Sequence, residues 1–223
     1  MVELDIIYEN KDYIVVNKAS GLISEKSFYE NITVETLVLN HLSKQKRKPY
    51  VGIIHRLDRV TSGVLILAKK KSILVEFNSL FSERKIQKTY LAIVKNKPQK
   101  NKGTLVNFLL KNTKEKKAAI VQTKTRNTQN AVLSYQLIGQ NNFGYLLEVR
   151  PKTGRFHQIR AQLSHIGSAI IGDEKYGSDQ EYLPLSICLH AWKLRYTSSE
   201  TNQQITYQAP LPNEAIWKFK EII

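Results

Sequence analysis

The chain has 223 residues, 42% of them hydrophobic, which is typical of a globular protein and excludes a disordered one. A single cysteine, Cys188, excludes a disulfide framework and a cysteine-rich metal site. The 34 Lys and Arg against 19 Asp and Glu give a net charge of +15, which favours a polyanionic partner. The acidic start argues against a signal peptide, and no apolar run approaches the roughly 20 residues of a membrane span. We therefore expect a soluble, cytoplasmic protein without membrane contact.

Apolar and β-branched runs bounded by turn residues predict strands along most of the chain. In chain order they cover a pair within 4–18 around the turn Asn10–Lys11, then 51–56, 62–70, 88–96, 103–110, 131–139, 143–151, 187–196 and 203–209. Helical spacing of apolar residues predicts helices over 33–44, 70–86, 156–166 (with Gly167 just past its end) and 213–223. The polar segment 111–130 is interpreted as a long loop or a loose hairpin. Because most strands follow one another directly, we expect an α+β fold. It would have a mixed, largely antiparallel sheet with flanking helices, in a single domain over 1–223.

The positive charge is concentrated in one part of the chain. Residues 84–126 contain 13 Lys or Arg and one acidic residue, Glu115. A clustered cationic field attracts phosphate backbones, so this segment favours a nucleic-acid partner. A solvated lysine surface that aids solubility is the alternative.

The stretch HRLDRVTSG, residues 55–63, places Asp58 between Arg56 and Arg59 in a turn between two strands. Such an aspartate can form the turn, pair with an arginine, or react. Cationic neighbours keep a carboxylate ionised, and an ionised carboxylate can act as a nucleophile or a general base. No metal is expected, because the chain has no HxH or HxxxH spacing and no second carboxylate near Asp58.

A second basic stretch, RPKTGRFHQIR, brings Arg155 and His157 to the start of a predicted helix, where backbone N–H groups favour anions, and Arg160 lies about one and a half turns further along. Arg160 follows a core residue and so requires a carboxylate partner, for which Asp58 is a candidate. A solvated helix face is the alternative. Tyr90, in the strand after a basic turn, is either a packing residue or a platform for an RNA base.

Several of these motifs together resemble one family. HRLDRVTSG resembles the signature of the RluA-type RNA pseudouridine synthases, and KTYLAIV (residues 88–94), TGRFHQIRAQLSHIG (153–167), IIGDEKYG (170–177) and LHAWKL (189–194) resemble its other motifs in the same order. The resemblance implies the pseudouridine synthase fold, with an RNA-binding cleft. It also implies isomerisation of uridine to pseudouridine within RNA, without metal or organic cofactor.

The resemblance also implies residue roles. Asp58 is the catalytic aspartate, Tyr90 packs against the target base and Arg160 pairs with Asp58. Arg59 fills the gap that the flipped base leaves. We further expect RNA contacts from His55, Arg56, Arg59, Lys85, Lys88, Arg155 and His157.

This chain departs from the family pattern at two points. Lys18-Ala19-Ser20-Gly21 lacks the proline that commonly follows the lysine, which predicts a looser turn. We also expect the catalytic core alone, without the N-terminal RNA-binding domain of many relatives. The basic segment would then supply the grip on RNA, with residues 111–126 closing over it.

The leading hypothesis is thus a monomeric RNA pseudouridine synthase that acts on ribosomal or transfer RNA. Two alternatives stay open. One is a non-catalytic RNA assembly factor on the same fold, and the other is a metal-independent RNA hydrolase with Asp58 as base and His55 or His157 as acid.

Overall fold

The computed structural model describes residues 3–45 and 48–220. The chain forms two compact units, the first from Met1–Lys88 and Ala191–Leu211, the second from Thr89–His190 and Pro212–Ile223. The strands β5 (Gln87–Val94) and β10 (Leu189–Thr197) each run from one unit into the other. The expectation of a single domain over 1–223 stays a prediction.

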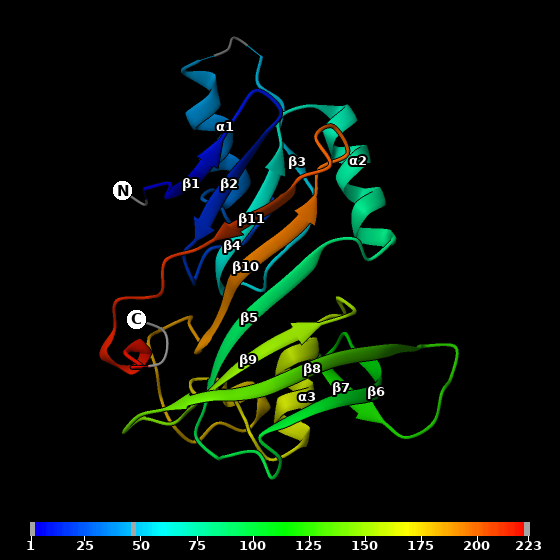
Figure 1. Ribbon diagram of the computed structural model, residues 1–223, viewed down its shortest axis with the longest axis vertical. Coiled ribbons are helices and arrows are strands. Elements are labelled where there is room, and N and C mark those ends of the chain that lie inside the picture. The colour runs from blue at the N-terminus through cyan, green and yellow to red at the C-terminus, as the bar shows by residue number, and fades with distance from the viewer. Residues whose placement is uncertain (1–2, 46–47, 221–223) are drawn as a thin grey trace. The chain divides into compact units, whose positions relative to one another are not determined.

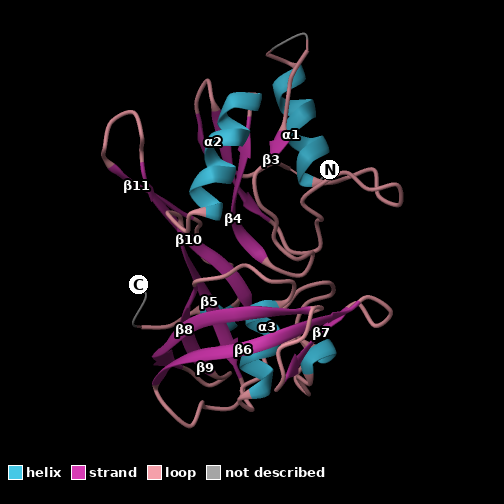
Figure 2. Cartoon of the chain, turned by 90° about the vertical axis from the view of Figure 1, so that its right-hand side faces the viewer, coloured by secondary structure: helices cyan, strands magenta, loops and turns pink. Residues whose placement is uncertain are grey.

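The first unit is built on antiparallel strands with two helices. Its strands follow the order β1 (Ile6–Glu9), β2 (Tyr13–Lys18), β4 (Ser62–Ala68) and β10, with β3 (Gly52–Ile53) paired to β4 and β11 (Gln204–Gln208) paired to β10. Figure 1 shows the orange-to-red β10 and β11 beside the blue-to-teal β1, β2 and β4. The helices are α1 (Val34–Ser43) and α2 (Lys71–Ser82), labelled in Figure 2.

The predicted apolar stripe of α2 packs on one face of this sheet. Phe77 is buried against alternate residues of β2 and β4, among them Tyr13, Val15 and Ile66. The hydroxyl of Tyr13 lies 2.7 Å from the hydroxyl of Tyr207 on β11, so these two buried hydroxyl groups are hydrogen-bonded to each other within the core. The intervening residues of β2 and β4 are buried as well, which explains why these strands are apolar on both faces.

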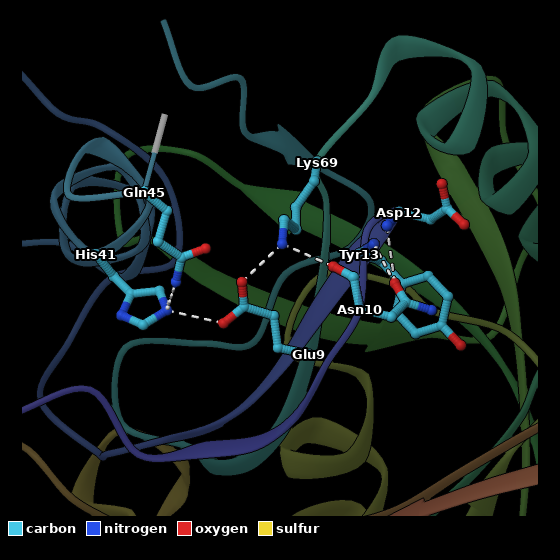
Figure 3. Close-up of polar contacts among 7 residues, drawn as sticks. All are labelled: Glu9, Asn10, Asp12, Tyr13, His41, Gln45 and Lys69. Carbon is cyan, nitrogen blue, oxygen red and sulfur yellow. Dashed lines mark hydrogen bonds and ion pairs between the residues drawn. The ribbon is translucent and has the colours of Figure 1, made fainter. Parts of the chain in front are cut away.

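A polar cluster around Glu9 fastens the β1–β2 hairpin to its neighbours (Figure 3). The Glu9 carboxylate accepts a hydrogen bond from the ammonium of Lys69 (2.6 Å). It also forms a hydrogen bond with Nε2 of the His41 ring on α1 (2.8 Å). Burial acts to raise the pKa of Glu9, but the bonds from Lys69 and His41 outweigh it and hold the pKa below its ordinary value. The Asn10 side chain accepts from the Asp12 and Tyr13 N–H groups and so forms the predicted turn.

The second unit is a five-stranded antiparallel arrangement with one α-helix. Its strands follow the order β5, β9 (Tyr145–Pro151), β8 (Thr128–Gln140), β6 (Lys102–Asn112) and β7 (Lys117–Val121). Helix α3 (Gln158–His165) packs on β6 and β7, and two 3-10 turns, η1 (Glu174–Tyr176) and η2 (Ala215–Trp217), complete the unit. The α+β class with largely antiparallel pairing, predicted from the sequence, is confirmed.

Of the two alternatives left open for segment 111–130, a long loop or a loose hairpin, the structure has a hairpin, because residues 117–121 form β7, which pairs with β6. Two local predictions need correction. The strand predicted over 51–56 is limited to β3. The backbone of Leu57, further along, forms its hydrogen bonds with the Ser24 side chain and not with a neighbouring strand. The helix predicted over 213–223 is only η2 within the described residues. There the Asn141 side-chain amide donates to the carbonyl oxygens of Ile216 and Lys218. Residues 221–223 lie outside the described part of the chain.

Candidate active site

Asp58 lies in the first unit, on a turn that joins β3 to β4. The Leu57 N–H donates to the Ser24 hydroxyl oxygen (3.2 Å), and that hydroxyl donates to the Leu57 carbonyl (3.1 Å). On the other side, the Thr61 N–H donates to the Asp58 carbonyl (3.0 Å) and closes the turn. The half-buried Asp58 side chain therefore projects from a backbone that is fixed before and after it.

Lys18 is the cation that accompanies Asp58 in this unit. Its side chain is 1% exposed, and its Nζ donates to the carbonyl oxygens of Ala19 (2.9 Å), Leu22 (2.8 Å) and Arg59 (3.1 Å). Burial lowers the pKa of the Lys18 ammonium to about 7, while the Asp58 carboxylate acts to raise it and the Arg59 guanidinium lowers it further. Lys18 thus joins the end of β2 to the residue after Asp58 and brings a positive charge to the carboxylate.

The turn that lacks the family's proline is well anchored. The Gly21 N–H donates to the Arg59 carbonyl (2.8 Å), and Gly21 itself has a φ of 85°, which favours glycine. Together with the Lys18 bonds, this ties residues 18–22 to the turn that carries Asp58. The backbone and the lysine side chain supply the restraint that proline would have supplied.

The two arginines that flank Asp58 bind other carboxylates. Arg56 pairs with Glu25, and Arg59 pairs with Glu30 and donates to the Gly21 carbonyl (2.9 Å). Both guanidinium groups keep solvent contact, with side chains 66% and 40% exposed. The RNA contacts expected of Arg56 and Arg59 stay predictions. To contact RNA, each guanidinium would have to release its glutamate or bind the glutamate and the RNA together.

His55 has a structural partner. Its Nε2 accepts from the Ile66 N–H (3.3 Å), and its ring lies 5.1 Å from that of Phe81. Burial, with a smaller contribution from the Lys88 charge, lowers the pKa of His55 to about 3, so the imidazole is neutral. An RNA contact from His55 would therefore be that of an uncharged ring.

The two lysines predicted to meet RNA near the start of β5 differ in their surroundings. Lys85 is exposed and pairs with Glu83 (2.6 Å). Lys88 is half-buried, its Nζ lies 5.7 Å from the centre of the Phe81 ring, and burial lowers its pKa. Of the two, Lys85 offers the better exposed charge.

In the second unit, Tyr90 lies on β5 opposite Val149 of β9, and it is half-buried. Arg160 lies on α3, where its Nε and Nη2 donate to the two carboxylate oxygens of Asp173 at 2.7 and 2.8 Å. Both side chains of this pair are buried, and the guanidinium lies over the Tyr176 ring at 5.0 Å. The sequence predicts a carboxylate partner for Arg160. Asp173, in the IIGDEKYG motif, is such a partner.

His157 and Arg155 organise the start of α3. His157 caps the helix in the left-handed region, with a φ of 51°, and its Nδ1 lies 3.0 Å from the Tyr176 hydroxyl. That hydroxyl also accepts from the Ala118 N–H of β7 (2.7 Å). Burial, then the Arg160 charge, lower the pKa of His157 to about 3, so the imidazole is neutral. The Arg155 Nε donates to the Asn130 carbonyl (3.1 Å).

The predicted residues thus form two groups. His55, Arg56, Asp58 and Arg59 share one turn of the first unit, and Arg155, His157 and Arg160 share the start of α3 in the second. Sequence reasoning missed Lys18 and Asp173, although a lysine that ends the buried run YIVVNK was a usable signal. Within residues 3–45 and 48–220, no group of three His, Cys, Asp or Glu could hold a metal ion.

Residues 12–165, which include the whole Asp58 turn, match the family model described as RNA pseudouridylate synthase. The chain belongs to this family. It is 35% identical to an uncharacterized RNA pseudouridine synthase of Haemophilus influenzae, over 87% of this chain and 83% of the relative. It is 30% identical to tRNA pseudouridine synthase C of Vibrio parahaemolyticus, over 94% and 91% of the two chains. It is 32% identical to ribosomal large subunit pseudouridine synthase C of Rickettsia bellii, over 93% and 68%.

The fold of this RNA pseudouridine synthase agrees with its family. The solved structure of human RNA pseudouridylate synthase domain containing 4 matches with a TM-score of 0.77 at 24% identity, over 94% of this chain and 89% of that one. The RluA-type resemblance and the enzyme class, an isomerase, are confirmed, and the non-catalytic alternative is not favoured. No helix among the described residues is long and apolar enough to cross a membrane.

Proposed function

We propose that this enzyme converts specific uridines of ribosomal or transfer RNA to pseudouridine, with Asp58 as the reacting carboxylate. It would act as a cytoplasmic monomer without metal or organic cofactor. The observation that carries the proposal is that the family match includes the turn that presents Asp58 beside Lys18. Two relatives are named as a transfer RNA enzyme and a large ribosomal subunit enzyme, which supports both substrate classes.

The reaction exchanges one bond for another within the same nucleotide. The bond from the sugar C1′ to the uracil N1 breaks, the base turns, and C1′ bonds to C5. C5 then loses its proton while N1 gains one, so atoms and charge balance. Asp58 can attack C1′, attack the base, or remove a sugar proton, and each route needs the ionised carboxylate. Lys18 favours that form because its ammonium attracts the carboxylate.

Tyr90 and Arg160 complete the proposed machinery. Tyr90 packs against the uracil, and its hydroxyl is suited to accept the C5 proton. Arg160 would pair with Asp58 while its Nε and Nη2 hold Asp173.

RNA binding is assigned to the exposed cations. In the segment 84–126, most lysines are exposed along β6, the β6–β7 hairpin and the adjoining turns, which suits contact with phosphates. Arg155 and His157 would contact RNA at the start of α3. The target uridine must leave its stack, which costs a few kcal/mol, and Arg59 would take its place.

The test is the replacement Asp58→Asn, which keeps the side-chain shape and removes the charge. Cellular RNA is incubated with the wild type, with this variant and with Asp179→Asn, which alters an exposed carboxylate of the second unit. Pseudouridine is then mapped at nucleotide resolution, alongside RNA from cells with and without the gene. Asp58→Asn should lower the rate at least about 100-fold, and Asp179→Asn should not. Full activity of Asp58→Asn would disprove the assigned role.

A further inference from the structure

Two aromatic side chains are fully exposed in the first unit. Phe28 and Tyr29 are 105% and 95% exposed and occupy the two central positions of a tight turn whose ends, Ser27 and Glu30, form a β-bridge. Central turn positions are normally filled by Gly, Pro, Asn, Asp or Ser, which suit the backbone and the solvent. Large rings at such positions gain nothing from packing, so their placement needs another explanation.

This aromatic turn, Ser27–Glu30, is tightly held. On one side the Lys26 N–H donates to the Glu35 carboxylate (2.8 Å), and on the other the Thr36 hydroxyl donates to the Asn31 carbonyl (3.1 Å). At the tip, the Tyr29 N–H donates to the Ser27 hydroxyl (3.2 Å). The rings therefore extend from a braced support rather than from a loose strand of chain.

The same turn is fastened to the residues around Asp58. Glu25 before it binds Arg56, and Glu30 at its end binds Arg59, so both arginines that flank Asp58 hold this segment. Ser24, just ahead of it, bonds both backbone groups of Leu57. Whatever the exposed rings bind is thereby positioned relative to the reactive carboxylate.

We infer that Phe28 and Tyr29 stack on unpaired bases of the substrate RNA next to the target uridine. The inference rests on the proposed function for its ligand and adds a recognition element to it. Each ring face can carry one base, and stacking tolerates any base because every base has a π-face. The exposed guanidinium groups of Arg56 and Arg59 lie at the base of the turn, and a guanidinium that binds a carboxylate can also bind a phosphate.

A protein partner fits the turn less well. A stable protein interface buries about 800 Å² on each side, whereas this tip offers two side chains on a narrow turn. Bases that have left a helix need only a rigid ring to stack on, and the target uridine must itself be unstacked. The chemistry of the tip therefore matches single-stranded nucleotides.

The test compares Phe28→Ala/Tyr29→Ala with Phe28→Trp/Tyr29→Phe, which keeps both ring faces. Val75→Ala serves as control, because Val75 is an apolar residue of α2 that is 69% exposed in the same unit. The dissociation constant for fluorescein-labelled oligouridylate is measured by anisotropy over a series of salt concentrations. Loss of each stacked base should weaken binding about 5- to 150-fold, so the double alanine variant should bind at least about 25-fold more weakly, with the salt slope unchanged because stacking involves no counterion release. The Trp/Phe variant and Val75→Ala should bind as the wild type does.

Two results would overturn the inference. One is binding by the double alanine variant within about twofold of the wild type. The other is weaker binding with a reduced salt slope, which would mean lost phosphate contacts instead of stacking. Asp58→Asn separates this inference from the proposed function, because it should bind oligouridylate normally yet form no pseudouridine. If the wild type formed none either, the proposed function would fail while the binding ratios still decided whether the rings stack.

Discussion

Replacing Asp173 by alanine is expected to destabilise the second unit strongly. The Arg160–Asp173 pair is 6% and 1% exposed and is joined by two bonds of 2.7 and 2.8 Å. Removing one partner of a buried pair costs about 3–5 kcal/mol, because the remaining charge stays out of water. For a chain of this size, each kcal/mol shifts Tm by about 2–4 °C, so Tm should fall by about 6–20 °C.

Urea unfolding followed by circular dichroism, together with differential scanning calorimetry, measures this loss. Asp179→Ala is the matched control, since its carboxylate is 76% exposed and pairs with Lys95 at the surface, and its Tm should equal that of the wild type. Arg160→Met/Asp173→Leu should regain most of the stability, because an apolar pair can replace a buried ion pair. A loss below about 1 kcal/mol in Asp173→Ala would refute the reasoning.

Two further predictions concern the turn around Asp58. Gly63→Ala should abolish folding, since a Cβ there would lie 2.2 Å from the Ala191 carbonyl oxygen at a φ of 112°. Gly167→Ala, whose Cβ would meet nothing within 4 Å, should cost only about 1–2 kcal/mol. Soluble yield and circular dichroism distinguish them, and a folded Gly63→Ala would contradict the predicted clash. Second, the pKa of His55 is lowered to about 3 by burial, so the unfolded chain binds a proton below the ordinary pKa of 6.5 and the folded chain does not. Stability should therefore fall as the pH drops below 6.5, by about 2 kcal/mol at about pH 5. His55→Gln should lose that part of the pH dependence in urea titrations at each pH, and an unchanged slope would argue against the assignment.

Local patterns were sufficient to predict much of the fold. The stripe of α2 was readable because one face of a helix repeats at a fixed spacing, and it does pack on the sheet. Gly167 was placed past the end of α3, and its φ of 78° fits that position. By contrast, the sequence did not decide between a loop and a hairpin for segment 111–130, because Ala118, the packing residue of β7, is small and follows two lysines. Ala118 lies in a strand because β7 pairs with β6. Its N–H donates to the hydroxyl of Tyr176, a residue that is far away in the sequence.

The site residues named from the sequence stay predictions, and the structure adds the pairing of several of them. The spacing of HRLDRVTSG identifies Asp58 as a carboxylate among cations, but it cannot say which cation approaches it. Arg56 and Arg59 were the obvious partners because they are adjacent, yet Glu25 and Glu30 bind them.

Lys18 brings a positive charge to Asp58 that was not predicted from the sequence. Its Nζ meets three carbonyl oxygens, and only a protonated amine has a hydrogen for each of them. The backbone cage thus opposes the burial that lowers the pKa of Lys18 to about 7, and the Asp58 carboxylate opposes it as well. The ammonium and the carboxylate therefore stabilise each other's ionised forms, and the third carbonyl of the cage belongs to Arg59. Because the carbonyl of the residue after Asp58 also accepts from Lys18, one buried side chain at the end of β2 both anchors the Asp58 turn and brings a positive charge to the Asp58 carboxylate.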